Sequence, residues 1–463
     1  MNLQANRSKA FAAAMLSASA TAGAAVCAVG PLAAEVVAGM AVVAGMLRSP
    51  GVALALYLLV PPFLKGLLQP LVPVDLTLAL GMVCVLDVAY GIVAKPISVK
   101  GSALVLWLAL LAMITLGSLY SPDQGIALSR VENWVGLVFL PLLVAFWVAR
   151  DQREVERCVW ACLAIGLIVT VLAVLTFSPS ERLLVGFTST INVGRASLMV
   201  PIIALLYVNK DGPRWMRGPL LVTLPLALFV AFAAGARGPL LMLIALAAAL
   251  AIWNVVRGRR ISKGVVASAA ATVLLLGVLV NVAALPSVSI DRFDRLTAYL
   301  AGGDTTTDGS LVQRLAAADL AISIFEDHPA LGAGTGAFTY YSQFVPLIWN
   351  EVAPHNILLE LASDWGVMGL GLFAVLVLTA VRSRPAESVW TAVWGLFLFF
   401  LANDMLGSFF DDRAFWGFAL LLLAAPVAVR PGRRTTERNG DAGPPATPSA
   451  TNSKDGANPA FGS

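Results

Sequence analysis

Apolar residues run along the chain in stretches long enough to cross a lipid bilayer. One such stretch covers 265–284, and similar stretches recur from one end of the sequence to the other. A transmembrane helix needs about 20 predominantly apolar residues, whereas core helices of soluble proteins are usually shorter. The pattern therefore predicts an all-α fold, that of a polytopic helical membrane protein.

Charges and turn residues divide the apolar stretches into about fourteen predicted spans. They lie near 10–29, 31–47, 51–69, 74–94, 102–120, 133–149, 156–177, 192–209, 218–235, 239–256, 264–285, 353–381, 386–407 and 413–429. The first span has an alternative interpretation, because Arg7 and Lys9 precede an Ala-rich stretch with small residues at its end. This arrangement also suits a cleavable signal peptide, and cleavage would leave thirteen spans.

Composition agrees with a membrane protein and excludes a water-soluble enzyme. Of the 463 residues, 59% are hydrophobic and only 13% are charged, against about 25% charged in an ordinary soluble domain. The net charge of +4 is too small to suggest a nucleic-acid surface, so no nucleic-acid partner is expected. The four cysteines lie in apolar stretches without a CxxC pair, which predicts neither disulfides nor a zinc site.

The distribution of basic residues predicts the topology. With a cytoplasmic N-terminus, 22 of the 31 Lys and Arg residues fall in the tails and the cytoplasmic connections, as the positive-inside rule requires. Both ends of the chain then face the cytoplasm. The other nine lie outside or near outer span ends: Lys65, Arg130, Arg182, Arg195, Arg237, Arg292, Arg295, Arg314 and Arg413.

Two segments are predicted to lie outside the membrane. A transmembrane domain over 1–429 would contain a large outer loop at 286–352, and loops of that length are usually functional. Within the loop, a helical spacing of apolar residues predicts an amphipathic helix that lies on the membrane or caps a cavity. These residues are Leu311, Leu315, Ala318, Ile322 and Phe325. The tail at 430–463 is rich in Pro, Gly, Ser, Thr and Asn and is expected to be disordered and cytoplasmic.

Two arginines at the outer ends of spans are candidates for a functional site. Arg195 lies near the start of one span, and Arg237 lies between glycines in a short turn. A guanidinium at membrane depth is costly unless it faces a polar cavity or a counter-charge. The alternative is that each side chain snorkels to lipid phosphate.

Histidine is scarce, and His355 is the candidate general base. It follows Pro354 at the outer edge of a predicted span, and a neutral imidazole can take a proton from a hydroxyl near physiological pH. The alternative is a hydrogen bonder at the helix start, the role expected of His328.

Two weaker signals have open interpretations. The glycine-rich run at 332–338 suits either a tight turn or a loop whose amides approach a phosphate. Asp404, Asp411 and Asp412 lie near the last outer turn, as partners of the arginines or as a solvated loop.

Five motifs follow one another along the second half of the chain. They are Ala236-Arg237-Gly238, Gly309-Ser310 to Arg314, Pro329-Ala330-Leu331-Gly332-Ala333-Gly334, His355-Asn356, and Glu360-Leu361 to Gly366-Val367-Met368-Gly369. In this order they resemble the O-antigen ligase and O-antigen polymerase (Wzy-like) family. The resemblance covers about 190–425 and is densest over 355–369.

The resemblance implies a GT-C-like membrane glycosyltransferase of the bacterial inner membrane, with its active site facing the periplasm. Its donor would be a glycan on undecaprenyl diphosphate, and its acceptor a sugar hydroxyl of lipid A core or of a growing polysaccharide. His355 would be the catalytic base, with Asn356 or Asp411 supporting the imidazole. Arg237 and Arg314, with Arg195 as a third candidate, would bind the diphosphate.

No cofactor and no metal are expected, and transfer should be inverting and metal-independent. A transporter or flippase of lipid-linked oligosaccharide is the alternative, because it would also have many spans and buried arginines. Such proteins usually contain two related halves, and no internal repeat is evident in this chain.

Overall fold

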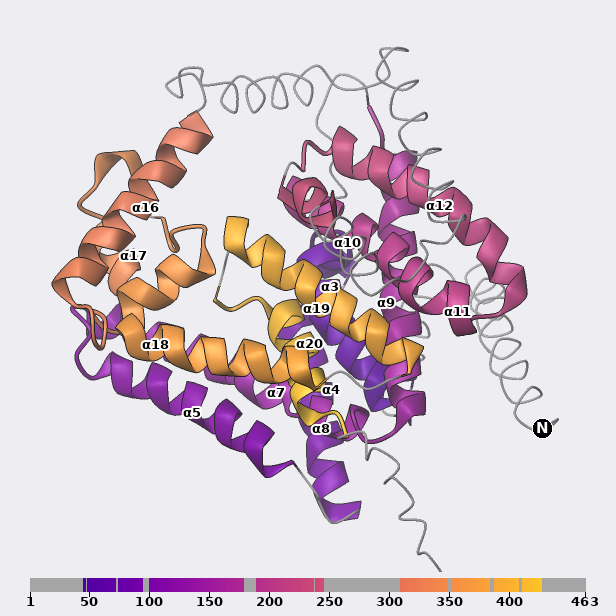
Figure 1. Ribbon diagram of the computed structural model, residues 1–463, viewed down its shortest axis with the longest axis horizontal. Helices are drawn as coiled ribbons and strands as arrows, with labels where there is room; N and C mark the ends of the chain where they lie inside the picture. Colours follow the sequence, from indigo (N-terminus) through magenta and orange to yellow (C-terminus); the bar gives the residue numbers. More distant parts are fainter. Residues whose placement is uncertain are drawn as a thin grey trace, which may run out of the picture. The chain divides into compact units, whose positions relative to one another are not determined.

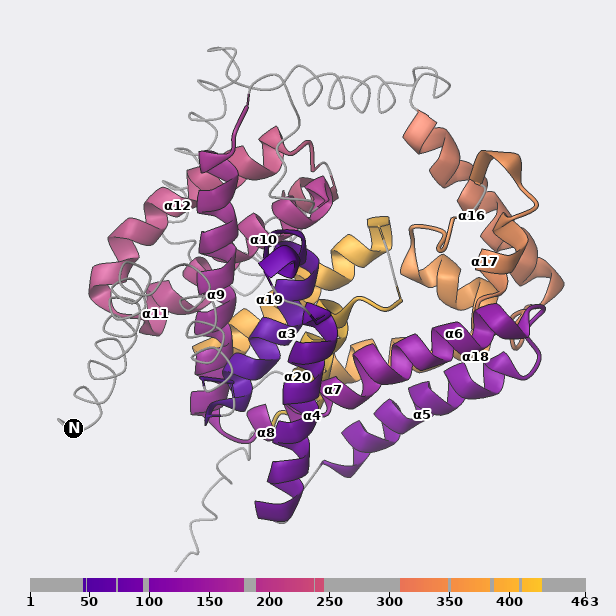
Figure 2. The same cartoon turned by 180° about the vertical axis from the view of Figure 1, so that it is seen from behind.

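The computed structural model describes residues 45–46, 48–71, 74–94, 100–178, 189–236, 238–244, 309–348, 351–383, 387–407 and 410–426. Within these ranges all regular secondary structure is helical (Figures 1 and 2). The elements are α3 (Pro50–Leu68), η1 (Gln69–Leu71), α4 (Leu76–Ala94), α5 (Gly101–Ser118), α6 (Gln124–Trp134), η2 (Val135–Phe139), α7 (Leu140–Leu142), α8 (Ala145–Val148), α9 (Gln152–Leu175), α10 (Thr190–Ile203), η3 (Ala204–Val208), α11 (Asn209–Asp211), α12 (Arg214–Ala233), α16 (Gly309–Asp327), α17 (Ala337–Ser342), η4 (Pro346–Ile348), α18 (Ile357–Arg382), α19 (Ser388–Gly407) and α20 (Arg413–Ala424).

Eight helical stretches in the described residues are long and apolar enough to cross a membrane. They are Pro50–Leu68, Leu76–Val93, Gly101–Ser118, Gln124–Val148, Gln152–Leu175, Thr190–Asp211, Ile357–Arg382 and Ser388–Gly407. Two shorter apolar helices, Thr223–Ala233 and Arg413–Ala424, coincide with further predicted spans. An all-helical, polytopic membrane protein is thus confirmed. The predicted spans 10–29, 31–47, 239–256 and 264–285 lie wholly or largely outside the described residues, so the count of fourteen stays a prediction.

A large apolar core forms where α3, α9, α10, α19 and α20 pack together. Close approach depends on small residues at the crossings: a Cβ added to Gly51 of α3 would lie 2.1 Å from the Glu154 carbonyl oxygen of α9. Cys84, Cys158 and Cys162 are buried and unpaired, as their apolar surroundings predict. The tight core fixes the helix ends that carry the polar side chains.

Contacts between helix ends agree with the predicted relative sides. Ser49 donates to Glu154 (2.6 Å), and Ser388 donates to Asp211, so connections predicted to be cytoplasmic meet one another. At the other side, Tyr120 donates to the Leu331 carbonyl (2.8 Å). Each of these contacts joins segments that the charge pattern places on one face of the membrane.

Residues 309–348 form a small helical unit, which we call the loop module. It comprises α16, α17 and η4 and packs on the first part of α18 (Figure 1). The predicted loop helix is confirmed as α16, and the side that packs against the protein is its alanine side. Leu315 and Ile322 are each 43% exposed, while the buried residues are Ala317, Ala321 and Ile324. Alanine permits close packing, and a pattern based on large apolar residues overlooks it.

The glycine-rich run of the loop module fits into a break in α18. Gly366 has φ 60° and ψ −152° inside this helix, a conformation that strongly favours glycine. The amides beyond the break donate to the loop module, Val367 to Pro329 O (2.8 Å) and Met368 to Ala330 O (3.3 Å). In return, Ala333 donates to the Ser363 carbonyl (2.9 Å). The break therefore anchors the loop module beside His355.

Candidate functional site

His355 lies just before α18, in a strained backbone conformation. Its φ of 55° is the only positive value at a non-glycine residue within the described ranges, and such strain clusters at functional sites. The helix begins later than the sequence predicts, at Ile357, because Asn356 is its N-cap: Asn356 Oδ1 accepts from the amides of Leu358 (2.9 Å) and Leu359 (3.3 Å). Asn356 thus holds the helix end, and its support of the imidazole stays a prediction.

Two opposite charges face the imidazole of His355. Its Nε2 lies 3.4 Å from Glu351 Oε2, and the positive charge of Arg314 acts on it as well. Burial and then Arg314 lower the pKa of His355 below its ordinary 6.5, and Glu351 only partly opposes them. The imidazole is therefore neutral at pH 7, the form that can accept a proton. Sequence reasoning missed Glu351, although it lies one helical turn's length before His355 in the chain.

Arg314 reaches this place from α16. Its Nη1 donates to the Leu406 carbonyl at the end of α19 (2.8 Å). The loop module thus brings together the predicted base and one predicted diphosphate ligand, which are 41 positions apart in the chain.

Arg195 has two carboxylate partners. On α10, its guanidinium contacts Asp404 (3.2 Å) and Asp412, and lies 4.7 Å from the ring centroid of Phe400. Although burial opposes ionisation, Arg195 lowers the pKa of Asp412. These two carboxylates neutralise the guanidinium, which makes Arg195 poorly suited to bind a diphosphate.

Arg237 lies outside the described residues, but its predecessor has a clear position. α12 ends at Ala233, and Gly235 with φ 65° reverses the chain there. The Ala236 amide donates to the Ala231 carbonyl (3.1 Å), which closes the helix end. A Cβ added to Gly194 of α10 would lie 2.5 Å from Ala236 Cβ. The residues before Arg195 and Arg237 are therefore packed together.

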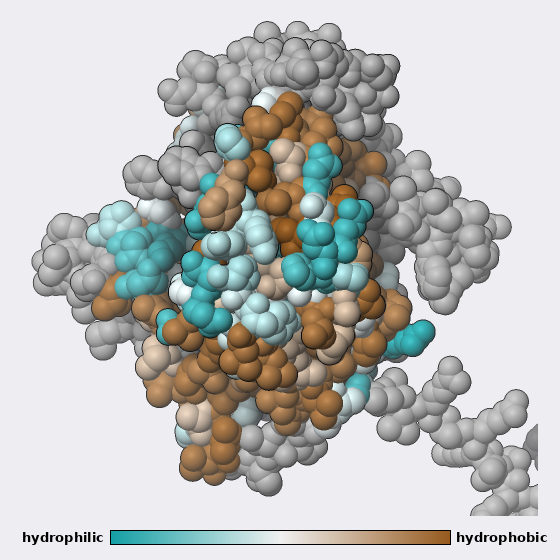
Figure 3. Space-filling view, turned by 90° about the vertical axis from the view of Figure 1, so that its left-hand side faces the viewer, coloured by the Kyte–Doolittle hydropathy of each residue, from teal (hydrophilic) through white to brown (hydrophobic). Residues whose placement is uncertain are grey.

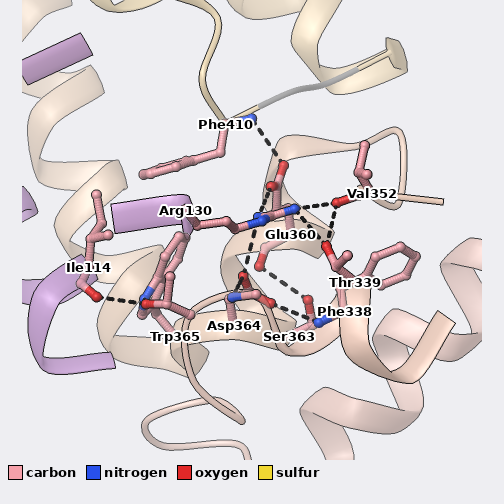
Figure 4. A network of polar contacts seen from close by, with 12 residues as sticks. Ile114, Arg130, Phe338, Thr339, Val352, Glu360, Ser363, Asp364, Trp365 and Phe410 are labelled. Atoms are coloured by element: carbon pink, nitrogen blue, oxygen red, sulfur yellow. Dashed lines mark hydrogen bonds and ion pairs between the residues drawn. The ribbon is translucent and has the colours of Figure 1, made fainter. Parts of the chain in front are cut away.

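A second polar network, which sequence reasoning did not select, surrounds Arg130 of α6 (Figure 4). Arg130 pairs with Glu360 (2.8 Å) and Asp364 (3.6 Å) of α18, and it donates to Thr339 Oγ1 (2.9 Å) and to the Val352 carbonyl. The sequence signal for this network was the presence of two acidic residues, Glu360 and Asp364, one turn apart in an apolar span.

The same carboxylates bind the backbone of neighbouring segments. Glu360 Oε2 accepts from the Phe410 amide (3.1 Å), and Asp364 accepts from the amides of Gly336 (2.8 Å) and Phe338 (3.1 Å). The network therefore joins α6, α18, the loop module and the turn before α20.

The glycine-rich run is a tight turn in this structure. Every amide from 332 to 338 donates to an oxygen of the protein. Gly332, Gly334 and Gly336 have φ between 69° and 102°, and an added Cβ on Gly332 would lie 2.4 Å from Asp364 C. The run thus has no amide left for a phosphate.

A pocket of about 490 Å³ lies beside the Arg130 network. Polar side chains of Ser129, Asn133 and Asp411 line it together with Arg130, and its other lining residues include Ile114, Trp134, Val352, Ala353, Trp365 and Phe410. Hydrophilic residues gather on the face that carries the loop module, next to a hydrophobic area (Figure 3). Asp411 is exposed and faces this pocket; the arginines that affect it are Arg130 and Arg413.

No metal-binding arrangement is formed by the described residues. Groups of three or more His, Cys, Asp or Glu side chains that could hold an ion do not occur in the described ranges. The positive charge at His355 is supplied by Arg314.

Comparison with protein families gives one match. A family model described as O-antigen ligase matches residues 222–374. The matched segment, about a third of the chain, is similar to the O-antigen ligase family. It covers the end of α12, the loop module, His355 and most of α18, which confirms the resemblance seen in the sequence. No curated protein matches the chain.

The O-antigen ligase match defines the general class of the protein. The family implies a glycosyltransferase-type enzyme of polysaccharide biosynthesis, and the apolar helices place it in a membrane. Arg195, Arg130 and Asp411 lie outside the matched segment, while Arg314, Glu351 and His355 lie within it.

Proposed function

We propose that the protein transfers a glycan from undecaprenyl diphosphate to a sugar hydroxyl at the periplasmic face of the bacterial inner membrane. The observation that carries this proposal is that the positive charge of Arg314 acts on His355 within the O-antigen ligase segment. A neutral base beside a fixed cation can deprotonate an acceptor while the cation binds the leaving group. The acceptor is lipid A core or a growing surface polysaccharide.

The chemistry is a single displacement with inversion. His355 takes the proton of the acceptor hydroxyl as its oxygen attacks the anomeric carbon of the donor. The bond from that carbon to the diphosphate oxygen breaks, and undecaprenyl diphosphate leaves with the negative charge. Arg314 and Arg237 bind that charge, so the step needs no metal ion.

The remaining candidates have supporting roles in this proposal. Arg195 holds Asp404 and Asp412, and so orders the connection between α19 and α20. Asn356 fixes the start of α18 behind the base. Asp411 belongs to the adjoining pocket.

The first prediction concerns the base. Replacing His355 by Ala should lower glycan transfer by about 10²- to 10⁴-fold, the usual contribution of a general base. Binding of the lipid-linked donor should change little, because the arginines remain. Transfer is measured with purified protein in detergent and a lipid-linked glycan donor, and donor binding is measured separately.

His328→Ala is the matched control, since the chain has two histidines and His328 is exposed in the loop module. Its activity should equal that of the wild type. Full activity of the His355 variant would remove this residue from the mechanism. Movement of the intact lipid-linked donor across vesicles without any transfer would support a flippase instead.

A further inference from the structure

The pocket beside Arg130 adjoins the segment that carries His355. Val352 and Ala353 line it, and they precede His355 by three and two positions. Arg314, which acts on the imidazole, does not line it. The segment 351–355 therefore has two neighbours: the positive charge of Arg314 acts on its end at His355, and the pocket lies beside Val352 and Ala353.

Three polar side chains that line this pocket lack a hydrogen-bond partner on any other described residue. Ser129 and Asn133 lie one turn apart on α6, and Asp411 follows the α19 end. None of the three forms a hydrogen bond or ion pair with another residue in the part of the chain that the structure describes. They offer a hydroxyl, an amide and a carboxylate, all of which bind sugar hydroxyls.

The rest of the pocket is largely buried and apolar. Trp134, Trp365 and Phe410 are at most 5% exposed and form its inner wall. The neighbouring Arg130 is held by Glu360, Thr339 and Val352, as Figure 4 shows. A fixed apolar wall with a few polar groups is typical of small-molecule sites, whose volumes are about 300–1,000 Å³; the 490 Å³ found here lies in that range.

We propose that this pocket binds the acceptor sugar, with Ser129, Asn133 and Asp411 as its specificity-determining contacts. The inference rests on the proposed function, because it assumes that a sugar hydroxyl must reach His355. The charge of the lining favours an acceptor over the donor diphosphate. Two lining carboxylates, Glu360 and Asp411, accompany one guanidinium that is already paired, so a diphosphate would be repelled and a neutral polyol accepted.

Binding can be measured without turnover by using the His355→Ala protein as the background. The probes are core oligosaccharide released from lipopolysaccharide by mild acid, the free repeat-unit oligosaccharide, and undecaprenyl diphosphate, each titrated by calorimetry in detergent. Asn133→Ala and Asp411→Asn should each raise the Kd of one oligosaccharide by about tenfold, the loss expected for one hydrogen bond to a polar or charged group. The Kd of undecaprenyl diphosphate should not change.

Matched controls lie on the same or a neighbouring element. Glu132→Ala changes the residue next to Asn133 on an exposed position that does not line the pocket, and Asp319→Asn removes an exposed carboxylate of α16. Both should bind all three probes like the background protein. Thermal melting of each variant checks that the fold is intact.

The outcomes separate this inference from the proposed function. Unchanged oligosaccharide Kd values in both pocket variants, or weaker undecaprenyl diphosphate binding instead, would overturn the subsite even if the wild type transfers glycan. Selective loss of oligosaccharide binding would support it even if His355→Ala kept full transfer activity. The oligosaccharide that binds identifies the acceptor source.

Discussion

At the scale of single residues, His355 combines a strained backbone with a charged environment. It has a positive φ, it is half-buried, and it faces one cation and one carboxylate. The lowered pKa means that the imidazole stays neutral until the pH falls below 6.5. As a base it is active above its pKa, so transfer should persist to mildly acidic pH and be lost as the pH falls through that value.

The second prediction tests the cause of this shift. Burial contributes most, and Arg314 contributes next. Replacing Arg314 by Gln removes a positive charge that disfavours the imidazolium, so the pKa of His355 should rise. Arg314→Lys keeps the charge and should leave the pKa nearly unchanged, yet it should still impair transfer because the planar two-point fork is lost.

Nuclear magnetic resonance of labelled histidine gives the measurement. The chain contains only two histidines, and His328→Ala identifies which signal belongs to which residue. The pKa of His355 is then read directly in wild type and both variants, without dependence on activity. The same pKa in wild type and Arg314→Gln would show that Arg314 does not act on the imidazole.

Residue type and a place near a span end selected His355, whereas Arg314 was selected through the family resemblance, and the roles of both stay predictions. The partners of the other polar residues could not be predicted from the sequence, because they depend on how distant helices pack. Asn356 proved to be a helix cap, and Arg195 is bound by Asp404 and Asp412. Glu351 was missed because a glutamate in a long loop has no distinctive sequence pattern.

At the scale of elements, ten predicted spans in the described residues correspond to helices. The largest boundary error is at 133–149, where the continuous helical stretch begins at Gln124. The apolar pattern is interrupted there by Ser129, Arg130 and Asn133. The helix nevertheless extends back to its N-cap, Asp123, and its polar first turns contact the loop module through Arg130 and Thr339. Hydropathy detects the part of a helix that matches the apolar membrane interior. It does not detect the polar turns by which the same helix contacts polar residues of the protein.

The third prediction concerns the break in α18. Gly366→Ala should destabilise the protein by about 1–3 kcal/mol, since it forces a side chain into a left-handed conformation. The added Cβ would also lie 2.6 Å from Gly332 N and from Pro329 O, both backbone atoms that cannot move aside singly. Thermal unfolding in detergent should show a lower melting temperature.

Gly371→Ala provides the matched control on the same helix. Nothing lies within 4 Å of its added Cβ, and its backbone is helical. It should leave stability unchanged or slightly raise it, because alanine favours a helix. Equal melting temperatures for the two variants would contradict a tight fit between the glycine-rich run and α18.

At the scale of the whole molecule, sidedness connects the topology to the proposed chemistry. Contacts at each end of the bundle join segments that the charge pattern assigns to one side: Ser49 with Glu154 on one, Arg195 with Asp404 and Asp412 on the other. Such contacts fix which ends lie together, and the positive-inside rule then orients the set. On that basis we predict that the loop module and His355 face the periplasm.

The fourth prediction tests this orientation with cysteine labelling in intact spheroplasts. Glu326→Cys on α16 should react with an impermeant thiol reagent, because this exposed position belongs to the outer loop. Glu387→Cys, exposed at the start of the segment leading into α19, should react only after the membrane is permeabilised.

The native cysteines Cys84, Cys158 and Cys162 are buried and should contribute little background. Replacing Cys27, the remaining cysteine, by Ser removes the other source of signal. The reverse labelling pattern would place His355 at the cytoplasmic face of the membrane. The proposed periplasmic transfer would then be wrong.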